Sequence, residues 1–169
     1  MAQDKYIVGF KLLAIYQIVG GVLGIAFIVP AFLSIEDLSY VSVVLIFAGF
    51  LLHSFSVYWG IMLFRSQYGS LVMSFVCQCL QGISISTLGF FYQLVSGFSF
   101  SLYLQSLSRD FHIQFGSDFS YFSVHVVDNP YDRMIGFNFV ALGIATVLYH
   151  EIKAIAREKK SDLVDSIGS

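Results

Sequence analysis

Four long apolar runs dominate the chain, at residues 12–33, 40–64, 68–95 and 134–154. Each holds about 20 residues or more, the length that a helix needs to cross a hydrocarbon core of about 30 Å. The connections between the first three runs are short, so these runs are expected to pack as antiparallel neighbours. The pattern therefore predicts four transmembrane helices.

The segment between the third and fourth runs, residues 96–128, has a different pattern. Apolar and polar residues alternate there, which is typical of strands. Turn-forming residues interrupt the alternation at 108–110 and 116–118. The segment is predicted to be a three-stranded antiparallel meander. Because a small isolated sheet is marginal in water, its Phe-rich face is expected to lie on the membrane surface or over one end of the helices. The alternating stretches are 98–105, 111–115 and 122–126.

The predicted fold is an all-α membrane protein, a four-transmembrane-helix bundle with a small antiparallel β-meander in the loop between helices 3 and 4. It forms a single integral membrane domain over residues 1–169, and the polar tail 161–169 is expected to be disordered. Composition agrees with this interpretation. The chain is 57% hydrophobic and 12% charged, about half the charged fraction of a soluble domain, and its mean hydropathy is +0.77.

The basic residues predict the orientation in the membrane. Apart from Arg109 and Arg133, in and just after the alternating segment, all basic residues fall at the same end of the predicted helices. That end is expected to be cytoplasmic. The protein is therefore predicted to be a multi-pass protein of a plasma or bacterial inner membrane, with both termini in the cytoplasm. The basic run after the last helix is either this ordinary flank or a contact for anionic lipid headgroups. The residues concerned are Lys5, Lys11, Arg65, Lys153, Arg157, Lys159 and Lys160.

Polar side chains inside the predicted spans form a candidate intramembrane cluster. His53 and Gln78 lie about equally far from the connection at residues 65–67, so they are expected to hydrogen-bond. His53 is interpreted either as packing through that bond or as a proton carrier or ligand contact. Asp, Glu, Lys and Arg do not occur in the middle of any predicted span, which argues against ion-coupled transport. The cluster comprises Gln17, His53, Gln78, Gln81 and Asn138.

Small and polar residues also form stripes on the predicted helices. On a helix of 3.6 residues per turn they fall on single faces, and the stripes of the second and third helices are expected to face each other. Gly20 and Gly24 make a G-x-x-x-G step, which allows close packing within the chain or at a dimer seam. The stripe residues are Ser42, Gly49, His53, Ser56 and Gly60, and Ser70, Ser74, Gln78 and Gln81. Gly136 and Gly143 are further candidates for helix packing.

Motifs for catalysis, metal binding or cofactor binding are missing from the sequence. Cys77 and Cys79 are two residues apart on a predicted helix and point in opposite directions, so they are not expected to form a disulfide. His112 and His125 lie on different predicted strands without further ligands at metal-binding spacing. No cofactor or metal is therefore expected. Nucleic-acid binding is not expected either, because the chain has no basic groove or stripe.

The function favoured by these patterns is that of an interaction or accessory subunit of a membrane assembly, with no chemistry of its own. Its partners are expected to be the lipid bilayer and either another protein or further copies of the chain. One alternative is a homo-oligomeric pore or small-molecule channel lined by the Ser, Gln and His stripes of helices 2 and 3. The other is a lipid-binding protein or an intramembrane enzyme.

Overall fold

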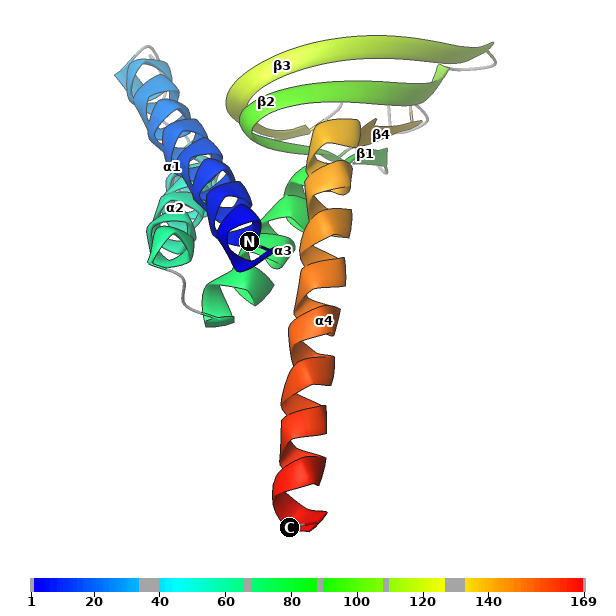
Figure 1. The fold of residues 1–169 in the computed structure, drawn as a ribbon. Coiled ribbons are helices and arrows are strands. Elements are labelled where there is room, and N and C mark those ends of the chain that lie inside the picture. Colours follow the sequence, from blue (N-terminus) through cyan, green and yellow to red (C-terminus); the bar gives the residue numbers. More distant parts are fainter. Residues whose placement is uncertain are drawn as a thin grey trace.

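The computed structural model describes residues 2–33, 40–65, 68–87, 90–107, 110–126 and 133–168. Three helices precede a four-stranded antiparallel sheet in the sequence, and a fourth helix follows it (Figure 1). The predicted all-α bundle of four spans is therefore wrong. Among the described residues, three helices are long and apolar enough to cross a membrane, and the β-structure is a substantial part of the fold. The elements are α1 (Ala2–Leu33), α2 (Tyr40–Phe64), α3 (Tyr68–Gly82), β1 (Ile83–Thr87), β2 (Phe90–Leu107), β3 (Asp110–Val126), β4 (Arg133–Asn138) and α4 (Phe139–Gly168).

Helices α1 and α2 form an antiparallel hairpin over the first two apolar runs. Gly21 of α1 lies against Val57 of α2, and Gly60 of α2 lies against Ile18 of α1. Their candidate membrane spans are Phe10–Pro30 and Val43–Phe64. Glycine at these positions lets the two helix backbones approach closely.

Helix α3 is too short to be the predicted third span, residues 68–95. It has 15 residues, which rise about 22 Å at 1.5 Å per residue, less than the roughly 30 Å of a hydrocarbon core. At Ile83 the sequence changes to Ile-Ser-Ile-Ser, and the chain continues as β1. This alternation, which the apolar run conceals, places isoleucine on one face of a strand and serine on the other.

Helix α4 begins at Phe139, so the predicted fourth span was placed too early. Residues 133–138 form β4 instead. The side-chain oxygen of Asn138 accepts hydrogen bonds from the backbone N–H groups of Val140 (3.1 Å) and Ala141 (3.2 Å), which is how an N-cap residue starts a helix. The candidate span of α4 is Phe139–Glu158. The helix continues to Gly168, across residues that the sequence predicted to be a disordered tail.

The sheet has the strand order β1-β4-β2-β3, with a further pairing between β1 and β2. β1 pairs with the start of β2 and with β4, and β4 pairs with the end of β2. These three strands therefore close into a small ring, because β2 takes part at both of its ends. β3 pairs with β2 along nearly the whole length of that strand.

A sharp bend in β2 makes this closure possible. The register with β3 shifts between Val95 and Phe98, and Gly97 adopts a φ of 98°, a conformation that favours glycine. The side chains of Gln93 and Tyr103 hydrogen-bond at 2.7 Å, although ten residues of straight strand would span about 33 Å. Figure 1 shows β2 and β3 curving together through this region.

The predicted turn at residues 116–118 is also wrong, because these residues lie inside β3. Gly116 pairs with Ser101. A Cβ atom on Gly116 would lie 2.9 Å from Cε2 of Tyr103, so the glycine makes room for an aromatic ring rather than for a turn. The three-stranded meander is thus replaced by two long strands, β2 and β3, together with β1 and β4.

A small apolar core joins the four helices. It contains one fully or almost fully buried residue from each: Ala14 of α1, Leu63 of α2, Leu71 of α3 and Leu148 of α4. Partly buried apolar side chains such as Phe75 and Ile152 pack around it. The four helices therefore share a core that their own apolar side chains supply.

Candidate functional site

A buried polar network lies where α1, α2 and α3 meet the bend of β2. The hydroxyl of Ser74 donates to Oε1 of Gln17 (3.0 Å), and the hydroxyl of Ser56 lies 3.4 Å from the backbone carbonyl of Gln17. The hydroxyl of Ser96 in β2 donates to that of Ser56 (3.1 Å). Residues of the predicted stripes of α2 and α3 thus hydrogen-bond to Gln17 of α1, and Ser56 also bonds to the sheet.

The bend of β2 explains why these polar groups are needed. A bulge leaves backbone groups outside the ladder, and such groups must find partners where water is excluded. The backbone N–H of Ser96 donates to Oε1 of Gln81 (3.2 Å), and that of Gly97 donates to the hydroxyl of Ser120 (2.8 Å). The hydroxyl of Tyr16 donates to the backbone carbonyl of Phe98 (2.7 Å).

The G-x-x-x-G step of α1 packs within the chain. A side chain on Gly20 would collide with the backbone of Ser96 and Gly97, and one on Gly24 would collide with the ring of His53. Gly20 therefore carries the contact between α1 and the strand bend. Gly24 carries a contact between α1 and α2.

His53 does not make the predicted hydrogen bond with Gln78. Both side chains are 0% exposed, and both ring nitrogens of His53 and both amide atoms of Gln78 lack a hydrogen-bond partner among the described residues. The ring of His53 instead packs against Gly24 of α1. His53 and Gln78 are about equally far from the connection between α2 and α3, but this does not bring them together. The His53 side chain lies on the face of α2 that packs against α1.

The remaining predicted site residues are distributed over the molecule. Asn138, the last residue of β4, is the N-cap of α4. Gly143 is exposed on α4, with no atom within 4 Å of its expected Cβ position. Gly49 lies beneath Phe122 of β3, and Gly136, in β4 rather than in a helix, lies beneath Tyr103.

The predicted headgroup contacts lie on α4. Lys153 and Arg157 are exposed, and the ammonium group of Lys153 is 5.7 Å from the ring centroid of Tyr149. The side chains of Lys159 and Lys160, and that of Ser42 in α2, lie outside the described part of the structure. Both described residues belong to α4, whose C-terminal part extends away from the sheet (Figure 1).

The inner face of the ring of strands is polar, a feature that sequence reasoning missed. The amide of Gln93 donates to the hydroxyl of Tyr103, which in turn donates to the carboxylate of Asp118 (3.0 Å). The alternation of serine with aromatic residues is visible in the sequence, but the closure of the strands that turns the serine face inward is not.

The outer face of the same sheet is apolar and exposed. On β3, Phe111, Ile113 and Phe115 are 65%, 61% and 63% exposed. The register places them on the same face as Leu102 and Leu104 of β2. In the part of the chain that the structure describes, β3 is also the one strand paired on a single side.

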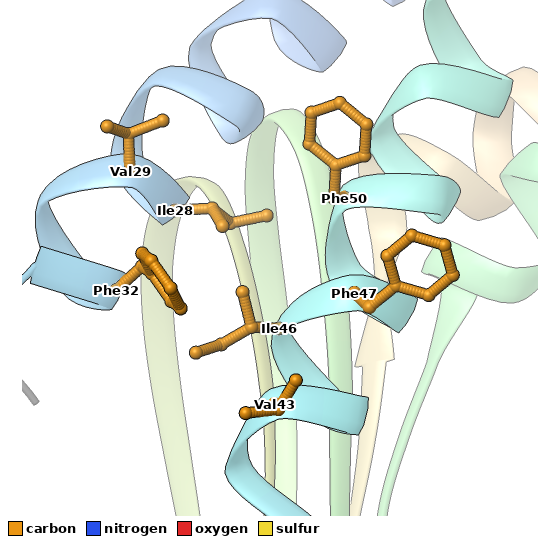
Figure 2. Close-up of a pocket in the computed structure, with 7 residues that line it drawn as sticks. All are labelled: Ile28, Val29, Phe32, Val43, Ile46, Phe47 and Phe50. Carbon is orange, nitrogen blue, oxygen red and sulfur yellow. The ribbon is translucent and has the colours of Figure 1, made fainter. Parts of the chain in front are cut away.

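Two open apolar grooves, each of about 290 Å³, flank α1. One lies between the C-terminal half of α1 and the N-terminal half of α2. Figure 2 shows its lining side chains, all of them hydrocarbon: Ile28, Val29, Phe32, Val43, Ile46, Phe47 and Phe50. The other lies between α1 and the bend of β2, where Tyr16, Phe98 and Phe119 contribute aromatic rings.

The described residues contain no group of three or more His, Cys, Asp or Glu side chains able to hold a metal ion. Cys77 is buried and Cys79 is exposed, as expected for two positions on opposite sides of a helix. His112 is exposed on β3, and the side chain of His125 lies outside the described part. No family model, curated protein or solved structure matches this chain.

Proposed function

We propose that the protein is an integral membrane protein that serves as an interaction or accessory subunit of a membrane assembly. The observation that carries the proposal is the open edge of β3, a strand of 17 residues whose outer side chains are exposed and apolar at Phe111, Ile113 and Phe115. An exposed apolar edge strand readily pairs with another polypeptide. Proteins normally cover or charge such an edge.

The buried polar groups support a non-catalytic role. Gln17, Ser56, Gln81 and Ser96 hydrogen-bond to one another or to backbone groups at the bend of β2. Their contribution is to hold a strand against three helices. A reaction would require polar groups that are accessible to a substrate, whereas these side chains are buried.

The pore alternative has less support from the same geometry. His53, Ser56, Ser74 and Gln78 are buried within a single chain. They would have to turn outward before they could line an axis between several copies. A lipid-binding role is favoured by one observation, the pair of uncharged grooves beside α1, whose lining suits an acyl chain.

Native mass spectrometry tests the proposal directly. The chain is purified in mild detergent from the membranes of cells that express it naturally, and we expect a complex with a different polypeptide. The variant Ile113→Lys, which places a charge on the outer side of the edge, is expected to lose that polypeptide. The matched control His112→Lys changes the neighbouring exposed residue on the opposite face and is expected to keep it. A homo-oligomer in the wild type would contradict the accessory role.

A further inference from the structure

The faces of the sheet are inverted relative to those of a sheet in a water-soluble protein. Such a sheet buries its apolar face and exposes its polar face. Here Ser84, Ser99, Ser101 and Tyr103 on the inner face are buried. On the outer face Ile83, Ile85, Phe98, Phe100 and Ile135 are exposed. Polar inside and apolar outside is the arrangement of strands that contact lipid.

Strand register shows that the inversion extends over β1, β4 and β2. Ile85 of β1 pairs with Ile135 of β4, which pairs with Leu104 of β2, and paired residues share a face. On the other face Ser84 pairs with Gly136, which pairs with Tyr103. One face is therefore apolar at these positions, and Leu104 extends it onto β3 by pairing with Ile113, although Ser106 and Ser117 also lie on this face.

The charged residues of the strands avoid the middle of the outer face, and Arg133, which pairs with Ser106, lies at the end of that face. Of the described strand residues, Asp110, Asp118 and Arg133 carry a formal charge. Asp110 begins β3 and Arg133 begins β4, and both pair with the last residues of β2, at the end of the sheet. Asp118 pairs with Ser99 on the inner face. No formal charge would thus have to enter hydrocarbon if the middle of the outer face did so.

The contacts of the sheet with the helices give its depth. Gly20, which packs against the bend of β2, is the midpoint of the candidate span Phe10–Pro30. Ser56, which accepts the hydrogen bond from Ser96, lies inside the candidate span Val43–Phe64. The bend of β2 therefore lies at the level of the hydrocarbon core if these helices cross the membrane.

The apolar surface is continuous from α1 onto the sheet. The groove between them is lined by Leu12, Ile15 and Val19 of α1 and by Phe98 and Phe119 of the sheet. The material that contacts the exposed side of α1 within its candidate span therefore also contacts the outer face of the sheet. In a membrane that cover is lipid.

We propose that the sheet is immersed in one leaflet of the bilayer, where the outer face, represented by Ile85, Phe98, Phe100 and Ile135, contacts lipid acyl chains. The inference rests on the proposed membrane integration and makes it more specific. The serine-rich inner face is shielded from lipid by closure of the ring of strands. At this depth the open edge of β3 requires another polypeptide, because lipid tails cannot satisfy backbone N–H and C=O groups.

Tryptophan quenching tests the immersion. Trp59 is the single tryptophan of the chain, so Trp59→Phe provides a silent background, to which Phe98→Trp or Ile135→Trp is added. Each protein is reconstituted into phosphatidylcholine vesicles with brominated acyl chains, and acrylamide serves as the aqueous quencher. The control Phe47→Trp places the probe on the exposed side of α2, inside its candidate span.

We expect both sheet positions to be quenched by the brominated lipid as strongly as Phe47→Trp, and to be protected from acrylamide. The two positions lie on different strands, so either one reports on the face if the other substitution disturbs the circular dichroism spectrum. Quenching of the sheet by acrylamide would overturn immersion while membrane integration stands. Protection of the sheet positions from both quenchers would overturn immersion and would indicate that another protein covers the outer face. A Phe47→Trp probe that brominated lipid does not quench would instead refute the membrane integration itself.

Discussion

Single polar side chains in the buried network differ in what they bind. Oε1 of Gln17 accepts a hydrogen bond from Ser74, whereas His53 is buried with neither ring nitrogen bonded to a described residue. A buried polar group without a partner carries a desolvation penalty. Position within an apolar run therefore does not tell whether a polar side chain stabilises the fold.

This difference predicts opposite effects of two leucine substitutions. His53→Leu is expected to keep or raise the free energy of unfolding, because it removes an unpaired polar ring from an apolar site. Gln17→Leu is expected to lower it, by about the 0.6 kcal/mol that interhelical hydrogen bonds in membranes average. Denaturant unfolding in detergent micelles measures both. If His53→Leu destabilises the protein more than Gln17→Leu, the imidazole has a functional or structural partner that the static geometry does not reveal.

At the scale of elements, the contact between α1 and the bend of β2 organises the fold. Gly20 brings the helix against the strand backbone, Tyr16 bonds the carbonyl of Phe98, and Gln81 bonds the N–H of Ser96. The first two residues come from α1 and the third from α3. The backbone of the bend is thereby held by a close approach and by hydrogen bonds from two helices, α1 and α3.

A glycine pair tests this contact. Gly20→Ala is expected to lower the free energy of unfolding by about 1–3 kcal/mol, because the added methyl group overpacks the backbone of Ser96 and Gly97. Gly143→Ala lies in a helix with open space around it and is expected to gain up to about 1 kcal/mol from helix propensity. Thermal unfolding of the two variants in one detergent compares them. Equal melting temperatures would show that the strand backbone yields to the methyl group.

At the scale of the whole molecule, three candidate spans and a shorter helix must be reconciled with the predicted orientation. Three crossings alone would place the termini on opposite sides. If the sheet is immersed as proposed, α3 and the sheet together complete a fourth passage. The chain would then return through α4 to the side on which it began.

This arrangement predicts sidedness for cysteine labelling in a background of Cys77→Ala and Cys79→Ala. Arg157→Cys on α4 is expected to react with a membrane-impermeant maleimide only from the cytoplasmic side, because basic flanks are retained there. His112→Cys, exposed near the far end of β3, is expected to react only from the opposite side. Labelling of both positions from the same side of sealed vesicles would refute the predicted orientation.

Much of the local structure is already present in the sequence. The first two apolar runs predict helices, and α1 and α2 occupy them. The alternation after residue 96 predicts strands, and β2 and β3 contain it. Asn138 followed by an apolar run and the Ile-Ser-Ile-Ser stretch at β1 also carry local signals, although the longer apolar runs around them hid both. Local periodicity is set by each residue's backbone preference and side-chain direction.

Tertiary structure alone decided which face of each element is buried. Alternation in β2 separates serine from phenylalanine, but only closure of the ring with β1 and β4 turns serine inward. Similarly, periodicity places His53 on a polar stripe, but only the packing of α1 against α2 directs it to Gly24 instead of Gln78. Burial depends on contacts between residues far apart in the chain, and in lipid the apolar face need not be the inner one.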